Sequence, residues 1–351
     1  MRVAIEASSL TLTSGGLSRY TSELSLALAR TFPDDQFHLV CDRPFPMPAH
    51  APPNLRQGGG PRNALERRWW LWGLAREMDR LGTELVHGPD FSVPYIPQRP
   101  SVVTIHDLSP WMEPAWHHGA GRVKRRTPVL LEMGAATMII TPSEHVRRDA
   151  IERFRLRPER VVAVPEAAAP WLRPVETAQP APPYFLFVGT LEPRKNLEML
   201  VAAWREVRRG HAVDLVIAGR RRADGPRFAP EPGLRLAGEV PDSELAALYS
   251  GALAFVYPSL YEGFGLPVVE AMQCGTPVIA SHAVEEAGGA AVAYADDPEE
   301  MARAMRAAIE QPDWHASRGA LSLERAREFT WERAARLTHE VYEEARRRFG
   351  S

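Results

Sequence analysis

The chain has 351 residues, more than a single ordinary hydrophobic core accommodates, so we expect two domains. Its formal net charge of −2 argues against nucleic acid as a partner, and Cys41 and Cys274 are too few for a disulfide framework or a cysteine-built metal site. No apolar run approaches the roughly 20 residues that a membrane-spanning helix needs, and residues 1–5 lead into a strand pattern rather than a signal peptide. A soluble protein of the reducing cytoplasm is therefore expected.

Short apolar runs alternate with amphipathic stretches over the first half of the chain, and a helix is expected over about residues 17–30. This alternation is typical of a parallel sheet with crossover helices. The expected strands are residues 3–5, 37–40, 85–87, 102–105, 138–141 and 161–164.

Two glycines, Gly15 and Gly16, stand between the first expected strand and the first helix. Backbone N–H groups that glycine leaves uncovered at such a point can face a phosphate or a donor sugar. A plain loop is the alternative reading. Arg19, on the same helix, either faces the acceptor side of a ligand site or is solvated.

Two histidines follow strands of the first half. His106 and Asp107 come directly after residues 101–105, so both stand at the carboxyl edge of the expected sheet. Asp107 is expected on the acceptor side or as the orienting partner of His106. His87 also ends a strand, where an acceptor-side role and core packing are equally good interpretations.

Two tracts combine basic residues with apolar ones, at residues 65–72 and 122–126. Either could contact a membrane surface or a polyanionic acceptor. For the tryptophans of the first tract, core packing is the commoner outcome. Peripheral contact with the inner face of the membrane is left open.

Six prolines fall within residues 165–183, which excludes regular structure there and marks a linker. A second alternating half follows, and its closing stretch, residues 330–349, reads as a helix. We expect a first domain over 1–168, a linker over 169–183, a second domain over 184–329, and a final helix over 330–351 that packs on the first domain. The expected strands of the second half are residues 185–189, 215–219, 234–238, 254–257, 277–281 and 292–294.

Arg194 and Lys195 lie in the segment 189–196, directly after the first strand of the second half. Only one other lysine occurs, Lys124, and a lysine ammonium suits a diphosphate as a compact point charge. The sequence contains no Asp-x-Asp and no helical histidine pair with metal spacing. We therefore expect Arg194 and Lys195 to hold a departing diphosphate without a metal and without a cofactor.

Two carboxylates, Glu262 and Glu270, are separated by seven residues across a strand-to-helix junction. Gly263 and Gly265 allow a tight loop with close backbone approach, and Pro267 suits a first helical turn. Carboxylates accept hydrogen bonds from sugar hydroxyls but repel phosphate, while helix N-termini attract phosphate. We expect the glutamates to hold sugars and the backbone to hold a diphosphate.

The string 261–275 resembles the Glu-x7-Glu signature of retaining glycosyltransferases of family 4. The resemblance implies the GT-B fold: two Rossmann-like doubly wound domains that face a central cleft, with a C-terminal helix crossing back to the first domain. It implies that Glu262 contacts the donor sugar and Glu270 the ribose, and that His106 lies near the transferred sugar. It also implies a donor-binding set of Gly15, Gly16, Arg194, Lys195, Gly263, Phe264, Gly265, Leu266 and Glu270.

The same resemblance implies an enzyme that moves a hexose from a nucleoside diphosphate sugar to a glycan or lipid-linked acceptor. The motifs are nearest to those of mannosyl- and rhamnosyl-type transferases of surface polysaccharide assembly, which favours GDP-mannose over UDP-glucose or a dTDP-sugar. The family usually has an arginine where this chain has Thr190, and we expect Arg194 to substitute for it. Two alternatives are a noncatalytic nucleotide-sugar-binding subunit and a nucleotide-sugar hydrolase or epimerase on the same fold.

Overall fold

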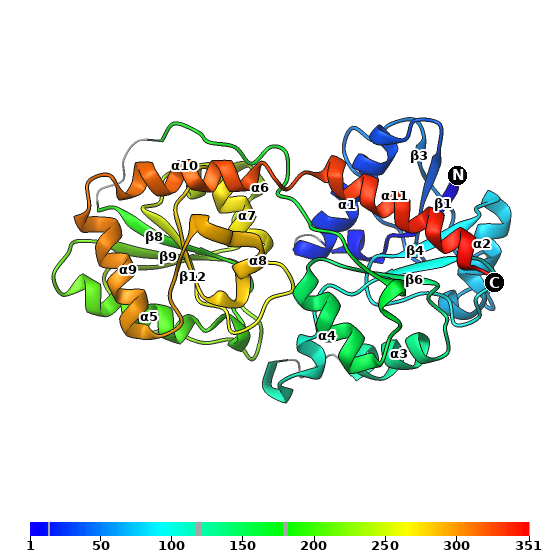
Figure 1. The fold of residues 1–351 in the computed structure, drawn as a ribbon, viewed down its shortest axis with the longest axis horizontal. Helices are drawn as coiled ribbons and strands as arrows, with labels where there is room; N and C mark the ends of the chain where they lie inside the picture. The colour runs from blue at the N-terminus through cyan, green and yellow to red at the C-terminus, as the bar shows by residue number, and fades with distance from the viewer. Residues whose placement is uncertain (13–14, 117–120, 178–181, 351) are drawn as a thin grey trace. The chain divides into compact units, whose positions relative to one another are not determined.

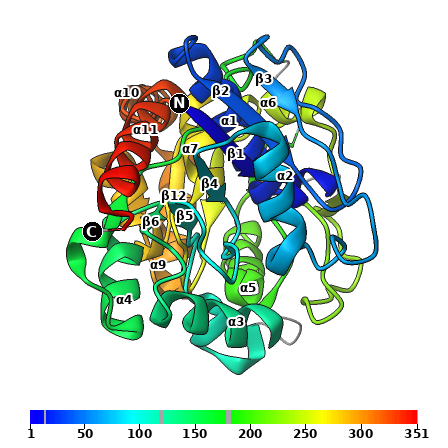
Figure 2. The ribbon, with the colours of Figure 1, turned by 90° about the vertical axis from the view of Figure 1, so that its right-hand side faces the viewer.

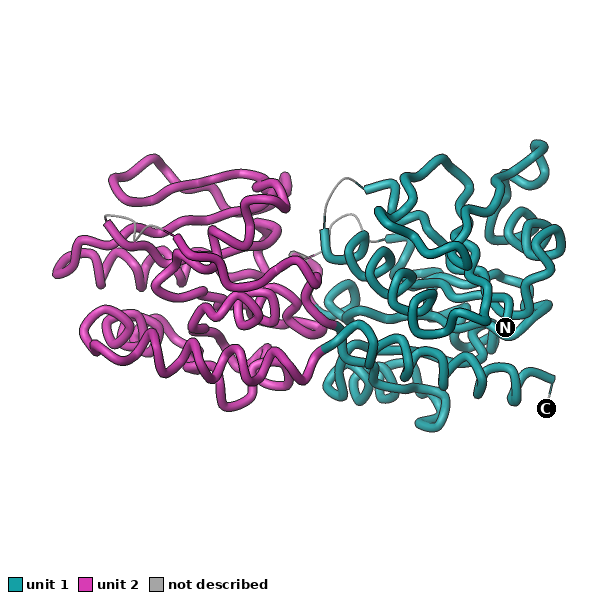
Figure 3. The backbone as a smooth tube through the Cα atoms, turned by 90° about the horizontal axis from the view of Figure 1, so that it is seen from above, with its two compact units in different colours: residues 1–112, 117–166, 330–351 teal, residues 113–116, 167–329 magenta. Residues whose placement is uncertain are grey.

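The computed structural model describes residues 1–12, 15–116, 121–177 and 182–350. The chain divides into two compact units, coloured teal and magenta in Figure 3. Unit 1 comprises residues 1–112, 117–166 and 330–351, and unit 2 comprises residues 113–116 and 167–329. Six residues that we expected in the first domain, 113–116 and 167–168, thus cluster with unit 2. Residues 178–181 of the predicted linker lie outside the described part of the chain, as do Ser14 and Ser351.

Unit 1 is built on a seven-stranded parallel sheet with the order β3-β2-β1-β4-β5-β6-β7. The six predicted strands are all present, and a short edge strand, β3, was not predicted. The strands are β1 (Arg2–Glu6), β2 (Gln36–Val40), β3 (Leu55–Gln57), β4 (Leu85–Gly88), β5 (Ser101–Thr104), β6 (Met138–Thr141) and β7 (Val161–Ala163). Its longer helices are α1 (Gly16–Thr31), α2 (Leu74–Leu81), α3 (Gly121–Glu132), α4 (Glu144–Phe154) and α11 (Trp331–Arg348).

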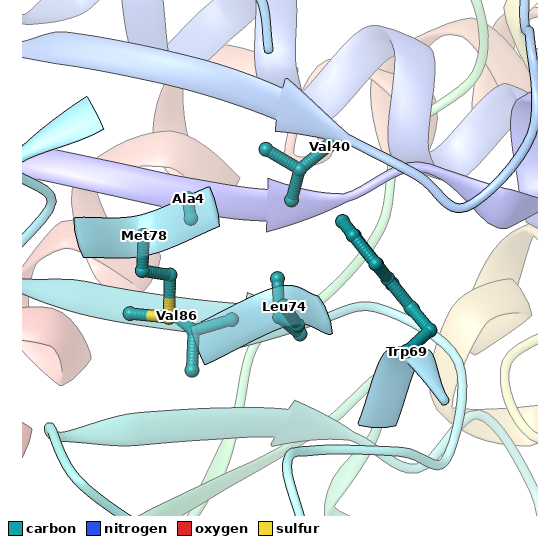
Figure 4. Packing of buried hydrophobic residues seen from close by; sticks show 6 residues of the cluster. All are labelled: Ala4, Val40, Trp69, Leu74, Met78 and Val86. Carbon is teal, nitrogen blue, oxygen red and sulfur yellow. The ribbon is translucent and has the colours of Figure 1, made fainter. Parts of the chain in front are cut away.

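The sheet of unit 1 has α2 on one face and α11 on the other (Figure 2). Successive side chains of a strand point to opposite faces, and β4 shows this directly. Val86 packs with Leu74 and Met78 of α2 in the buried cluster of Figure 4, whereas the next residue, His87, hydrogen-bonds to Tyr342 of α11. The closing helix α11 also packs along α1 (Figure 1), so the C-terminal helix belongs to the unit that contains the N-terminus.

The tryptophan tract of residues 65–72 divides between core and surface. Trp69 is 3% exposed and packs on Val40 and Leu74 (Figure 4), whereas Trp72 is 38% exposed. Core packing therefore accounts for Trp69. In the part of the chain that the structure describes, no helix combines the length and the apolar character needed to cross a membrane.

Unit 2 repeats the architecture with a six-stranded parallel sheet of order β10-β9-β8-β11-β12-β13. All six strands of the second half were predicted, and they are β8 (Tyr184–Val188), β9 (Asp214–Ala218), β10 (Leu234–Gly238), β11 (Ala254–Tyr257), β12 (Val278–Ala280) and β13 (Val292–Tyr294). The helices are α5 (Leu197–Arg208), α6 (Asp242–Ser250), α7 (Leu266–Gln273), α8 (Glu285–Gly288), α9 (Pro298–Glu310) and α10 (Trp314–Ala326).

Each sheet reverses its strand order at one point, between β1 and β4 in unit 1 and between β8 and β11 in unit 2. In doubly wound sheets ligands bind outside the carboxyl ends of the strands that flank such a switch point. The fold therefore marks two places to search for function.

Candidate active site

The switch point of unit 2 is occupied by the segment after β8 and the loop after β11. The first segment forms a single 3-10 turn, Pro193–Lys195, and Asn196 then takes a left-handed conformation with φ 52° before α5 begins. Asparagine tolerates this region better than most residues. The turn presents Arg194 and Lys195 toward the loop of residues 258–265.

Glu262 lies between the two cations. The Lys195 ammonium donates to Glu262 Oε1 at 2.6 Å, and Arg194 Nη1 lies 3.0 Å from Glu262 Oε2. Each of the three residues is only 7% exposed. The structure thus joins Arg194 and Lys195 to Glu262 in one buried ion-pair cluster, although Glu262 lies 67 positions after Lys195 in the sequence.

The charges of this cluster set its ionisation. Burial alone would raise the pKa of Glu262, but Arg194 and Lys195 outweigh it and lower that pKa to about 2. Burial lowers the pKa of Lys195, against the opposing effect of Glu262. The Tyr257 hydroxyl accepts a further hydrogen bond from the ammonium, whose nitrogen lies 4.8 Å from the Tyr257 ring centroid.

A second carboxylate, Glu192, supports the cluster from behind. Its Oε1 accepts from Arg194 Nη2 at 2.8 Å, and its other oxygen pairs with Arg222. Arg222 is held in turn by Asp224. Glu192, Arg222 and Tyr257 were not predicted from the sequence. Only Glu192 carried a signal, because it stands two residues before Arg194.

Arg194 also fixes the loop that carries Glu262. Its Nη1 donates to the backbone carbonyl of Tyr261, the residue before Glu262. The loop ends at Gly265, which has φ 95°, and a Cβ there would lie 2.7 Å from Val284 Cγ1. Only glycine fits that position without displacing its neighbour.

Three other donor-side candidates of unit 2 are almost fully buried: Phe264, Leu266 and Glu270. Phe264 is 6% exposed and meets Phe329 edge-on at 5.4 Å, and Leu266 begins α7 with 9% exposure. Glu270 lies in α7 with 2% exposure and accepts a hydrogen bond from the Tyr249 hydroxyl at 3.0 Å. Glu262 in the loop and Glu270 in the helix occupy the places that the sequence predicted.

In unit 1, His106 follows β5 and is held by two acceptors. Its Nδ1 lies 3.1 Å from Glu166 Oε1, and its Nε2 lies 2.7 Å from the carbonyl oxygen of Pro89. A carbonyl and an ionised carboxylate can only accept, so the ring form that satisfies both contacts at once is the imidazolium, with hydrogen on both nitrogens. Burial opposes this charge, but the hydrogen bond and charge of Glu166 prevail and raise the pKa of His106.

The prediction that Asp107 orients His106 was wrong. Asp107 accepts from the backbone N–H and the hydroxyl of Ser109, at 2.9 and 2.6 Å, and so stabilises the following turn. Glu166 orients the imidazole instead. Glu166 lies 60 residues further along the chain, just beyond β7, at the start of the proline-rich stretch 165–183.

His87 takes the packing alternative. It is fully buried, with Nδ1 2.8 Å from the Tyr342 hydroxyl and Nε2 2.8 Å from the Thr104 hydroxyl. Burial lowers its pKa to about 3, so it is a neutral core histidine. It does not reach a surface on which an acceptor could bind.

The glycine loop and Arg19 lie at the start of α1. Gly15 has φ 121°, and no atom of the described residues stands within 4 Å of a Cβ placed on Gly15 or Gly16. Arg19 lies one turn into α1 and is partly buried. Within the described ranges no group of three or more His, Cys, Asp and Glu side chains has the arrangement of a metal site.

Known proteins match both units. Residues 14–168 match the model of Glycosyltransferase Family 4, and residues 182–311 match that of Glycosyl transferases group 1. O-antigen chain mannosyltransferase B from Escherichia coli is 33% identical over 304 residues, which cover 79% of this chain and 78% of that protein. The chain therefore belongs to the family 4 glycosyltransferases, and the predicted family is confirmed.

Solved structures show the same fold. Sucrose-phosphate synthase from Thermosynechococcus elongatus matches with a TM-score of 0.72 and 21% identity, over 98% of both chains. HepE from Anabaena, in complex with UDP and glucose, also gives 0.72, with 18% identity over 98% of this chain and all of that one. The GT-B fold expected from the sequence is thereby confirmed, and family membership makes the protein a glycosyltransferase.

Proposed function

We propose that this glycosyltransferase transfers mannose from GDP-mannose to a hydroxyl of a glycan or lipid-linked saccharide, with retention of configuration and without a metal. The observation that carries the proposal is the buried cluster of Arg194, Lys195 and Glu262 at the switch point of unit 2. The mannosyltransferase relatives support mannose as the sugar. The neighbour that binds UDP supports a nucleoside diphosphate as the leaving group.

The cluster has the components that transfer from a diphosphate requires. Negative charge develops on the diphosphate as the C1–O bond breaks, and fixed cations in a dry site stabilise it strongly. Lys195 and Arg194 are such cations, and in this role they replace a divalent metal. Glu262, which accepts hydrogen bonds, is assigned to the hydroxyls of the donor sugar, and Glu270 to the ribose.

The two hydrogen bonds of the His106 ring argue against a role as general base. An imidazolium that already donates from both nitrogens cannot take the acceptor proton, so His106 is assigned to polarising the reaction centre through its charge. In the retaining reaction the bond from C1 to the acceptor oxygen then forms on the face that the diphosphate leaves. The departing diphosphate oxygen takes the acceptor proton.

The test is a donor panel. Purified protein with excess EDTA is incubated with GDP-, UDP-, dTDP- and ADP-sugars, and the released diphosphate is identified. Without an acceptor we expect only slow release of GDP, from GDP-mannose alone and lost in Glu262→Ala. With an acceptor we expect faster release and an α-linked product by NMR. Release that requires a divalent ion, or an inverted product, would refute the corresponding part of the proposal.

The same panel separates the alternatives. Free mannose and GDP at full rate without any acceptor would indicate a hydrolase. Thermal stabilisation by a nucleotide sugar without turnover, whatever acceptor is supplied, would indicate a noncatalytic binding subunit.

A further inference from the structure

A cavity of about 550 Å³ lies in unit 1, lined by residues that follow β1, β2 and β4. Glu6 and Ser8 come from the end of β1, Asp90 and Ser92 from the segment after β4. β1 and β4 flank the switch point of this sheet, which is where doubly wound folds bind ligands. The cavity therefore stands at the place in unit 1 that corresponds to the cluster in unit 2.

The two basic tracts of the sequence meet at this cavity. Residues 67–71 line one part of it and residues 122, 123 and 126 another. Tract 65–72 precedes α2 and tract 122–126 lies in α3, so the fold brings together segments about 50 residues apart. A shared cavity favours a ligand in common over two separate surface roles.

The charge of the lining is positive. Five arginines face three carboxylates, Glu6, Asp42 and Asp90. Burial, with Asp90 and Asp42 nearby, raises the pKa of Glu6 to about 7, which halves its negative charge near neutral pH. Among the described residues Arg43 is paired with Asp42, while the other four form no ion pair: Arg67, Arg68, Arg122 and Arg126. A cavity with this excess of unpaired arginines suits an anion.

Three residues of the lining carry buried polar atoms with no hydrogen-bond partner in the described part of the chain. They are the indole Nε1 of Trp69, the hydroxyl of Ser92 and Nε of Arg126. Trp69 and Ser92 are 3% and 1% exposed. These three atoms have almost no accessible surface, so a ligand in the cavity would meet instead the lining arginines, which are at least partly exposed: Arg43, Arg67, Arg68, Arg122 and Arg126.

The rings of the lining give the ligand a shape. The Arg126 guanidinium lies over the Trp70 ring at 5.1 Å from its centroid, which orients its donors before any ligand arrives. Trp70 and Tyr95 line the same cavity as Glu6 and Asp90. This combination suits a sugar, because a pyranose offers apolar C–H faces to rings and hydroxyl donors to carboxylates. No hydrogen bond to the Asp90 carboxylate is formed within the described residues.

We propose that this cavity binds the acceptor, and that the acceptor is an anionic saccharide whose phosphate or carboxylate group is held by Arg126 while its hydroxyls meet Glu6 and Asp90. This rests on the proposed transferase function and adds the chemical class of the acceptor.

The test is calorimetric titration of the full chain in the absence of any donor. The probes are mannose 1-phosphate, glucuronic acid, methyl α-mannoside and inorganic phosphate. We expect an anionic sugar to bind about tenfold or more tightly than the neutral glycoside and than phosphate alone. A preference for mannose 1-phosphate indicates a phosphate-linked acceptor, and a preference for glucuronic acid indicates an acidic glycan.

One variant and its matched control locate the binding. Arg126→Gln should weaken binding about tenfold or more, whereas Arg125→Gln, on the same helix and outside the cavity, should not change it.

The proposal is overturned if phosphate alone binds as well as the anionic sugars, or if Arg126→Gln and Arg125→Gln bind alike. It is equally overturned if Arg126→Gln changes only binding to phosphatidylglycerol vesicles, which would identify a membrane-contact surface. Turnover in the donor panel with no binding of anionic sugars would refute this inference alone. Binding of anionic sugars with no donor cleaved would instead refute the transferase proposal.

Discussion

Replacing Glu262 with glutamine tests the cluster at the switch point of unit 2 directly. The variant keeps the shape and the hydrogen-bonding oxygen but removes the charge between Arg194 and Lys195. Those cations lower the pKa of Glu262 from 4.5 to about 2, which corresponds to about 3 kcal/mol in favour of the ionised carboxylate. Removing one partner of a buried ion pair typically costs about 3–5 kcal/mol of stability, a range that includes the value from the pKa of Glu262.

The direction of the pKa shift of Glu262 decides the pH at which the variant should be measured. A depressed carboxylate pKa adds stability that is present above the unfolded value of 4.5 and is lost as the pH falls toward 2. At pH 7 the contribution is complete. For a folding unit of this size, 3 kcal/mol corresponds to a fall of about 6–12 °C in the melting temperature of the variant.

The assay is calorimetry at pH 7, with Glu231→Gln as the matched control. Glu231 also pairs with an arginine of unit 2, Arg205, at 2.7 Å, but that pair is exposed and screened by solvent, so little change is expected. If Glu262→Gln melts within 2 °C of the parent protein, the cluster does not stabilise unit 2 and the reasoning fails. If both variants fall equally, burial is not the cause.

Three further predictions concern other residues. Glu166→Gln should lower the pKa of His106, because it removes the hydrogen bond and charge that raise it; an unchanged imidazole titration by NMR would contradict the imidazolium assignment. The raised pKa of Glu6, about 7 against 4.5 unfolded, gives stability that is present below pH 4.5 and lost as the pH rises through 7; Glu6→Gln should abolish this loss of about 3 kcal/mol between urea unfolding at pH 5 and at pH 8. Gly265→Ala should destabilise unit 2 by about 1–3 kcal/mol, since φ is 95° and Val284 lies too close; an unchanged urea midpoint would show that the loop relaxes freely.

The strands of this protein were predictable because each is a short apolar run between turn residues. Leu85, Val102 and Phe185 begin runs that are almost wholly buried, and such runs signal a parallel strand covered on both faces. β3 escaped notice for the same reason: of its three residues only Leu55 is buried, so no apolar run exists to detect.

The site was predictable only where its residues are local in sequence. Glu262, Arg194 and Lys195 stand in motifs that can be read directly. Glu192 and Arg222 are 30 residues apart, and His106 and Glu166 are 60 apart, and each pair forms because two parallel strands end at one edge. Pairings of this kind depend on strand order, which the sequence does not display.

Under the proposed function, the pairing inside the cluster would impose an order on ligand binding. Without a ligand, the Lys195 ammonium and the Arg194 guanidinium are each paired with one oxygen of Glu262. A diphosphate would compete for the two cations, and that competition would free Glu262 for sugar hydroxyls. Nucleotide recognition would then be coupled to sugar recognition through one carboxylate. We therefore expect GDP alone to bind and mannose alone not to bind, with mannose binding appearing only in the presence of GDP; mannose binding to the nucleotide-free protein would show that Glu262 is not held in reserve by its cations.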